Sequence, residues 1–228
     1  MKKNKIVMSV ISGLLVAAVA VGGTLAYLSD TSNQVTNTFN VGTGYIDDDV
    51  HQGLWLDEVD ITKDDGSRTE KGNDYLDLLP GDEVEKDPTF HITKGSVESY
   101  VIARVTGVQD AMAAGYIFKD ADGEVGFNDV WVKVADLNGS TVDPTFGGAD
   151  GYYIYCGEDG APITVDASKA EADVNLVPMF NTVELNGDIT DLAAVAEQTV
   201  KVQGVAVQAD NNTAEGALEV ALGVKWEG

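Results

Sequence analysis

The stretch TVKVQGVAVQ, residues 199–208, decides the fold class of this chain. Its side chains alternate with a period of two, which indicates a β-strand rather than a helix. One face of the strand would carry Val200, Val202, Gly204 and Ala206, and the other Lys201, Gln203, Val205 and Val207. The stretch therefore predicts a strand that contributes to a sheet near the C-terminal end of the chain.

Short segments of similar character precede this stretch. They cover residues 41–50, 89–93, 98–108, 130–134, 151–157 and 176–185. Turns rich in Gly, Asp, Asn and Pro separate them, and about eight short strands with such turns are typical of an antiparallel sandwich or jelly roll. We therefore expect an all-β fold, an antiparallel jelly-roll-like sandwich with short helical insertions.

Some local features of the expected domain are more specific. The turn Lys94-Gly95-Ser96 predicts that residues 89–93 and 98–108 pair as an antiparallel hairpin. Residues 57–74 are charged and contain Gly, so they predict an exposed loop. Helical character is expected at residues 109–116 (helix or loop), 189–197 and 213–222, the last with Asn212 or Thr213 as its N-cap.

The N-terminus has the three parts of a secretory signal peptide. Lys2, Lys3 and Lys5 precede an uncharged run at residues 6–21, and small residues follow. This pattern predicts a signal peptide at 1–26, with cleavage between Ala26 and Tyr27. The alternative is an uncleaved membrane anchor, although the apolar run is shorter than the roughly 20 residues that span a bilayer. The mature chain, 27–228, is expected to be a single domain outside the cytoplasm.

The chain is strongly acidic. Its 228 residues include 38 Asp and Glu against 14 Lys and Arg, and removal of the three signal lysines leaves a formal charge of −27. Such a surface repels the phosphates of nucleic acid, which we therefore do not expect as a partner. Self-repulsion favours a soluble monomer, so assembly of many copies would depend on screening by salt or divalent cations.

Few residues point to catalysis. Cys156 is the single cysteine, which excludes an intramolecular disulfide, and we expect it to be a small buried side chain. Of the two histidines, neither His51 nor His91 belongs to an H-E-x-x-H motif, and His91 is expected on a strand surface. No G-x-S-x-G elbow occurs either. We therefore do not expect an enzyme, although a surface hydrolase with metal bound by the histidines and acidic clusters is an alternative.

Acidic loops offer candidate calcium ligands, and no other cofactor is expected. Asp120, Asp122 and Glu124 resemble part of a calcium loop, because carboxylate oxygens suit this hard cation. Trp131, however, occupies the twelfth position from Asp120, where a bidentate Glu would complete the site. Further acidic clusters lie at residues 47–49 and 64–65, and in a chain this acidic such clusters also arise as solvated loops.

Aromatic residues allow another alternative, a monomeric surface adhesin that stacks on sugars. Its candidate residues are Trp55, Trp131, Tyr152, Tyr153 and Tyr155. Packing in the core is the more ordinary use of such side chains.

Five segments resemble the TasA/camelysin family. Residues 22–31, GGTLAYLSDT, are similar to its signal region, and residues 38–42, TFNVG, to its T-F-x-x-G element. LPGD at 79–82 with Gly95-Ser96 and VAVQADN at 205–211 resemble interior elements of the family. The resemblance implies an exported jelly roll that is processed by a dedicated signal peptidase of the SipW type.

The same resemblance implies a secreted fibre subunit of the biofilm matrix or cell surface. Copies would assemble head to tail by donor-strand exchange, in which residues 27–40 of one copy add to a sheet of the next, with a possible accessory anchoring protein. The apolar residues of this segment are Tyr27, Leu28, Val35 and Phe39. From the residues alone, residues 27–40 could equally be a disordered tail or a first strand of the chain's own sheet instead of a donor strand. Camelysin-like members are also described as surface metalloproteases.

Overall fold

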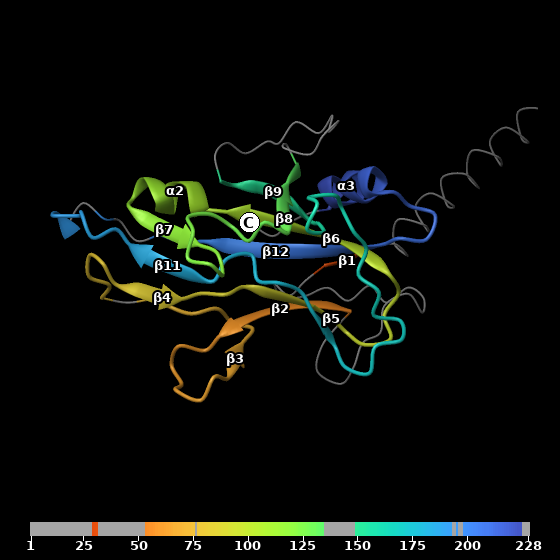
Figure 1. Ribbon diagram of the computed structural model, residues 1–228, viewed down its shortest axis with the longest axis horizontal. Helices are drawn as coiled ribbons and strands as arrows, with labels where there is room; N and C mark the ends of the chain where they lie inside the picture. Colours follow the sequence, from red (N-terminus) through yellow and green to blue (C-terminus); the bar gives the residue numbers. More distant parts are fainter. Residues whose placement is uncertain are drawn as a thin grey trace, which may run out of the picture.

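The computed structural model describes residues 29–31, 53–75, 77–134, 149–192, 195 and 198–224. They form three antiparallel sheets and two short helices (Figure 1). The largest sheet has five strands, in the spatial order β1 (Ser29–Thr31), β12 (Lys201–Gln208), β6 (Ser99–Thr106), β9 (Gly151–Tyr155) and β8 (Trp131–Lys133). The stretch TVKVQGVAVQ at residues 199–208 thus contains β12, which lies between β1 and β6.

Two smaller sheets complete the β-structure. The four-stranded sheet has the order β10 (Val174–Asn175), β5 (Thr89–Ile92), β2 (Leu54–Val59) and β3 (Arg68–Thr69). The three-stranded sheet has the order β4 (Glu83–Glu85), β11 (Thr182–Leu185) and β7 (Tyr116–Lys119). In Figure 1, β2 and β5 lie on one side of the central pair β6 and β12, which gives a sandwich-like arrangement.

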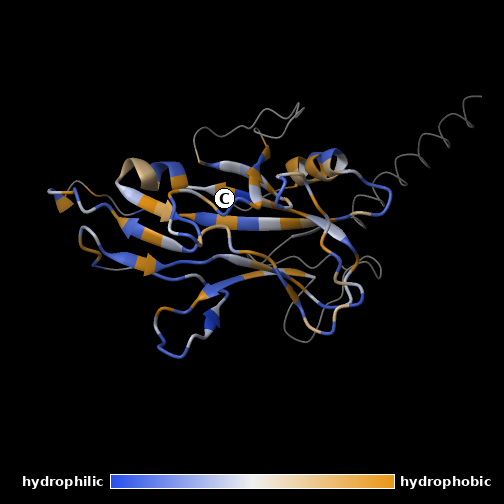
Figure 2. Cartoon of the chain, in the orientation of Figure 1, coloured by the Kyte–Doolittle hydropathy of each residue, from blue (hydrophilic) through white to orange (hydrophobic). Residues whose placement is uncertain are grey.

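The main core combines residues of all three sheets. It includes Leu54 and Phe90 from the four-stranded sheet, Val101 and Ala206 from the five-stranded sheet, and Phe118 from the three-stranded sheet, all nearly or fully buried. Apolar and polar residues alternate along many of the strands, as the colours of Figure 2 show. This alternation is what a strand with one face toward a core requires.

A second core lies on the opposite face of the five-stranded sheet. Helix α3 (Ala214–Gly223) contributes its buried residues Ala217, Leu218 and Ala221, which pack with Val205 and Val207 of β12. Because Ala206 belongs to the first core and its neighbours to the second, β12 is buried on both faces. The shorter helix α2 (Val108–Ala113) follows β6 directly.

The expected fold class is confirmed: the protein is mostly β, sandwich-like and antiparallel, with short helices. Helix α2 and helix α3 overlap the segments 109–116 and 213–222 and extend past them by one residue each, and the Thr213 side chain accepts a hydrogen bond from Gly216 N–H, as an N-cap should. For the helix expected at 189–197, the described residues 189–192 show no α-helix, and most of the remainder lies outside the described part. The strand expected at 41–50 and the signal peptide at 1–26 also lie outside it.

The hairpin prediction for residues 89–93 and 98–108 is wrong. Strand β5 pairs with β2 and β10, whereas β6 pairs with β9 and β12. The turn around Gly95 therefore carries the chain from one sheet to another, and its Gly95 N–H donates to Ala167 O. A short turn is compatible with both arrangements, and packing of the two sheets selects the crossover.

The exposed loop predicted at 57–74 is confirmed at residues 61–66 and 70–72, which are exposed, but it is wrong at the positions that belong to β2 and β3 and at Asp60. Asp57, Glu58 and Asp60 are buried, and residues 68–69 form β3 against β2. The three buried carboxylates each pair with a cationic side chain: Asp57 with Arg68, Glu58 with Lys86 and Asp60 with Lys63. Composition alone does not indicate these pairs.

Candidate functional site

The edge of the five-stranded sheet is the first candidate site, because the N-terminal segment lies there. The backbone of β1 runs antiparallel to β12, with Ser29 opposite Val207, Asp30 opposite Ala206 and Thr31 opposite Val205. On its other side β12 pairs with β6 along its whole length. β12 thus pairs with Ser29–Thr31, which begin two residues after Tyr27, the expected first residue of the mature chain.

Within a single chain, Ser29–Thr31 is an edge strand of the chain's own sheet. This matches one alternative from the sequence. The expected polymerisation residues Tyr27, Leu28, Val35 and Phe39, and the cleavage residue Ala26, lie outside the described residues, so their predicted roles stay predictions.

Close packing constrains β12 where it passes over the opposite sheet. At Gly204, a β-carbon would lie 2.3 Å from the ring carbon Cε1 of Phe90. Glycine is therefore needed at this position for the two sheets to approach.

A second candidate site is a polar network at β2, β3 and β5. Arg68 Nε donates to Asp57 Oδ1 at 2.7 Å, and its Nη1 donates to Asp87 Oδ2 at 2.6 Å. Arg68 Nη2 also donates to the hydroxyl of Thr89. The guanidinium of Arg68 in β3 thus connects β2 with the start of β5. The planar arrangement of its N–H donors suits several acceptors at once.

His91 belongs to the same network. Its Nε2 lies 2.8 Å from Asp57 Oδ1, its Nδ1 lies 2.8 Å from Asn175 Oδ1, and its ring stacks on Trp55 with centroids 3.8 Å apart. Only 4% of His91 is exposed, so the expectation that it lies on a strand surface is wrong. Asp57 and Trp55 of β2 and Asn175 of β10 surround the His91 ring, which explains why this polar side chain is buried.

The electrostatics of Asp57 follow from these contacts. Burial by itself would raise the pKa of Asp57, but hydrogen bonds and charges from His91 and Arg68 outweigh burial and leave that pKa below its ordinary value. The carboxylate therefore stays ionised and holds both partners in place.

An adjacent group surrounds Glu58. Lys86 Nζ donates to Glu58 Oε2 at 2.7 Å, and Asn73 Nδ2 donates to Glu58 Oε1 at 2.9 Å. The Tyr75 ring lies over Lys86 Nζ, 5.2 Å from its centroid. Burial and the nearby Glu58 carboxylate raise the pKa of Tyr75, so its hydroxyl remains protonated and donates to Glu85 O.

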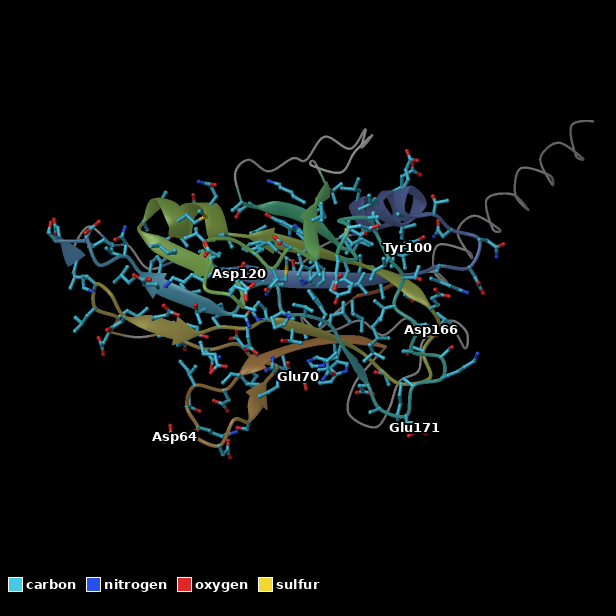
Figure 3. All side chains as sticks on the ribbon, in the orientation of Figure 1. Asp64, Glu70, Tyr100, Asp120, Asp166 and Glu171 are labelled. Carbon is cyan, nitrogen blue, oxygen red and sulfur yellow. The ribbon has the colours of Figure 1, made fainter. Side chains whose placement is uncertain are left out.

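The carboxylate of Asp120, one of the expected calcium ligands, makes hydrogen bonds within its own loop. Asp120 Oδ1 accepts hydrogen bonds from the backbone N–H groups of Asp122 and Glu124, so this carboxylate orders its own loop. In Figure 3, Asp120 is labelled apart from two pairs of acidic residues, Asp64 with Glu70 and Asp166 with Glu171. Calcium binding at Asp120, Asp122 and Glu124 stays a prediction.

The aromatic candidates for sugar stacking lie in the interior. Trp55, Trp131, Tyr152 and Tyr153 are buried, and Tyr155 packs against the main core with its ring 5.0 Å from that of Trp131. Cys156 is buried as expected, and burial raises the pKa of its thiol to about 11. These side chains stabilise the fold rather than form a sugar-binding surface.

The polar network does not fit a metal. Both nitrogens of His91 already contact oxygen atoms, and the carboxylates of Asp57 and Asp87 are engaged by Arg68. In the ranges that the structure describes, no group of three or more His, Cys, Asp or Glu is arranged to hold a metal ion. His51 lies outside those ranges, and so does the acidic cluster at 47–49.

The described helices are too short and polar to cross a bilayer, as far as the structure describes the chain. The searches among curated proteins and among solved structures each gave no significant match. A family model with the description camelysin metallo-endopeptidase matches residues 1–112. That match includes the N-terminal region, β1, the polar network up to His91, and β6. Residues 1–112 are therefore similar to the camelysin family, in agreement with the resemblance to TasA and camelysin.

Proposed function

We propose that this protein is a secreted structural subunit of an extracellular fibre, assembled head to tail by its N-terminal segment. The observation that carries the proposal is the pairing of Ser29–Thr31 with β12 at the edge of the five-stranded sheet. An edge that accepts this segment from its own chain presents the same backbone groups to the segment of another chain.

The chemistry of such an exchange is simple. Main-chain hydrogen bonds would supply affinity, and the alternation of side chains along β12 would set the register. The donor segment and the acceptor edge are different surfaces, so the contact is heterologous and generates a filament rather than a closed dimer. The signal peptide would delay assembly until a peptidase of the SipW type releases Tyr27, and an accessory protein would anchor the fibre at the cell surface.

Truncation tests the proposal. A chain that begins at Tyr27 should form filaments visible by electron microscopy at raised protein concentration and salt. A chain that begins at Val41 lacks β1 and should remain monomeric, with an unchanged circular dichroism spectrum apart from the lost segment. Filaments from the shorter chain would contradict assembly through the N-terminal segment.

A metal-dependent endopeptidase is the second candidate, because the matching family model carries that description. The polar network around His91 does not fit a metal, so this activity would need residues outside the described ranges, such as His51. Purified protein incubated with casein, with and without a chelator, separates the two functions. Proteolysis that chelation and His51→Ala both abolish would favour the enzyme.

A further inference from the structure

One carboxylate holds an amine and an amide together at the edge of the polar network. Glu58 is 5% exposed, and its two carboxylate oxygens contact Lys86 Nζ at 2.7 Å and Asn73 Nδ2 at 2.9 Å. Because both oxygens belong to one carboxylate, the lysine amine and the asparagine amide are neighbours. We propose that Lys86 and Asn73 form an intramolecular isopeptide bond, with Glu58 as the acid–base group.

Hydrogen bonds fix the orientation of the Asn73 amide. Its Oδ1 accepts a hydrogen bond from Ile61 N–H at 3.2 Å, and its Nδ2 donates to Val59 O at 2.7 Å. The backbone therefore fixes which side of the amide carries oxygen. The Ile61 N–H polarises the carbonyl and would stabilise the negative charge that develops on Oδ1 during attack. The leaving nitrogen faces Glu58, where a proton can be supplied.

The surroundings of Lys86 favour its reaction. Its side chain is 17% exposed, the Tyr75 ring covers Nζ, and the Tyr75 hydroxyl lies 3.5 Å from Asn73 Nδ2. The Glu58 carboxylate that would accept the ammonium proton is already in hydrogen-bond contact with Nζ, at 2.7 Å. Holding both reactants in place replaces a bimolecular encounter.

The reaction balances without an oxidant or a co-reactant. Glu58 takes one proton from the Lys86 ammonium, and the neutral amine attacks Cγ of Asn73 to give a tetrahedral intermediate. A second proton moves from Nζ to Nδ2, and the Cγ–Nδ2 bond breaks. Ammonia then leaves with the proton that Glu58 held, as ammonium. The product is an Nζ–Cγ amide, and Glu58 returns to its carboxylate form.

The bond would close the connection between two sheets. Asn73 follows β3 of the four-stranded sheet, and Lys86 follows β4 of the three-stranded sheet. The chain between them includes the exposed turn at residues 79–82. A chain whose single cysteine excludes an internal disulfide would gain a covalent tie at this position. This inference does not depend on the proposed fibre function.

Mass spectrometry of the purified mature chain tests the bond directly. The intact mass should be lower than the sequence mass by one ammonia. After denaturation and digestion with trypsin, cleavage at Lys86 should be blocked, so that residues 72–94 appear as one peptide that also lacks one ammonia. A further cut inside the loop, after Glu83 or Glu85, should leave the two parts covalently joined.

Three variants give the controls. Lys86→Arg keeps the charge beside Glu58 but should have the full sequence mass, and Glu58→Gln should also have the full mass. Lys119 makes ion pairs with Glu83 and Glu184, so Lys119→Arg is a matched control that should keep the ammonia deficit. Circular dichroism checks that each variant is folded.

Two results would overturn the inference. One is an unmodified mass for the wild-type chain with normal cleavage at Lys86. The other is an ammonia deficit that persists in Lys86→Arg, because that result indicates a succinimide at an asparagine rather than a bond to lysine. A deficit that persists in folded Glu58→Gln would overturn the assignment of Glu58 as the acid–base group.

Discussion

At the scale of single residues, the unexpected feature is a set of charges held inside a β-sandwich. Arg68 joins Asp57 and Asp87, and His91 joins Asp57 and Asn175. Burying a charge is costly unless it is paired and hydrogen-bonded, and here each charged group has such partners. The network therefore contributes to stability in a way that depends on pH.

Asp57 gives the pH-dependent prediction. Its pKa lies below the ordinary value of 3.8 in the folded protein. The resulting stabilisation is complete above the ordinary pKa and is lost as pH falls from there through the lowered one, because the unfolded state takes up a proton at a higher pH than the folded state does. Urea unfolding from pH 7 to pH 3 should show the free energy of unfolding of the wild-type chain falling more steeply than that of Asp57→Asn.

Asp57→Asn should also cost about 2 kcal/mol at pH 7, since a hydrogen-bonded charge partner of Arg68 is removed. The exposed Asp188 provides the control, and Asp188→Asn should follow the wild-type curve throughout. Parallel curves for Asp57→Asn and the wild type would show that the network does not govern acid stability.

Gly204 gives the packing prediction. A β-carbon there would lie 2.3 Å from the Phe90 ring, and Phe90 is fully buried. Gly204→Ala should therefore lower the free energy of unfolding by about 1–3 kcal/mol through overpacking. Gly223, where a β-carbon meets no atom within 4 Å, is the matched control. Equal stability of the two variants in urea would contradict the proposed close approach of β12 and β5.

At the scale of elements, the sequence predicted those strands and helices that depend on interactions between neighbouring residues. The alternation of residues 199–208 predicted β12, and its two faces do belong to two different cores. The helical character of residues 213–222, with Asn212 or Thr213 as the N-cap, predicted α3. These features depend on neighbours in the sequence, so one sequence is enough to find them.

Pairing between distant segments could not be read in the same way. The turn at 94–96 is compatible with a hairpin, yet β5 and β6 belong to different sheets. His91 was expected in solvent because its partners, Asp57 and Asn175, are 34 and 84 positions away. Similarly, Lys86 and Glu58 are 28 positions apart, and no local motif signals their contact. Tertiary packing determines these sites.

The N-cap of α3 gives a prediction for a single element. The Thr213 hydroxyl accepts from Gly216 N–H at 3.2 Å. Thr213→Ala should lower the free energy of unfolding by about 1 kcal/mol, whereas Thr213→Ser keeps a hydroxyl and should cost much less. Urea unfolding measures both values. A loss of the same size in both variants would indicate that the threonine methyl group, rather than the cap, matters.

At the scale of the whole molecule, charge opposes assembly. The expected mature chain carries a formal charge of −27, so copies that approach head to tail repel one another. At an ionic strength of about 0.15 M, interactions between exposed charges are screened beyond about 8 Å. Filament formation by the chain that begins at Tyr27 should therefore accelerate as sodium chloride is raised.

Light scattering at fixed protein concentration measures how the rate of filament formation depends on sodium chloride. The chain that begins at Val41 serves as the control and should scatter little at every salt concentration. A rate that falls as salt is added would mean that attraction between opposite charges, rather than strand addition against repulsion, drives assembly.

The central claim is that β12 of one copy accepts the N-terminal strand of another. Cysteines at the paired positions 29 and 207 test it, in a background where Cys156→Ala removes the native thiol. Ser29→Cys with Val207→Cys should give a cross-link within the chain in monomers. In filaments, the same double variant should give a ladder of covalently joined chains on a denaturing gel without reductant.

Each single-cysteine variant should give no ladder, which controls for chance contacts between filaments. The result we predict is a ladder that only the double variant forms and that appears as filaments grow. Filaments of the double variant that dissolve entirely into single chains, each cross-linked within itself or not at all, would contradict strand exchange at this edge.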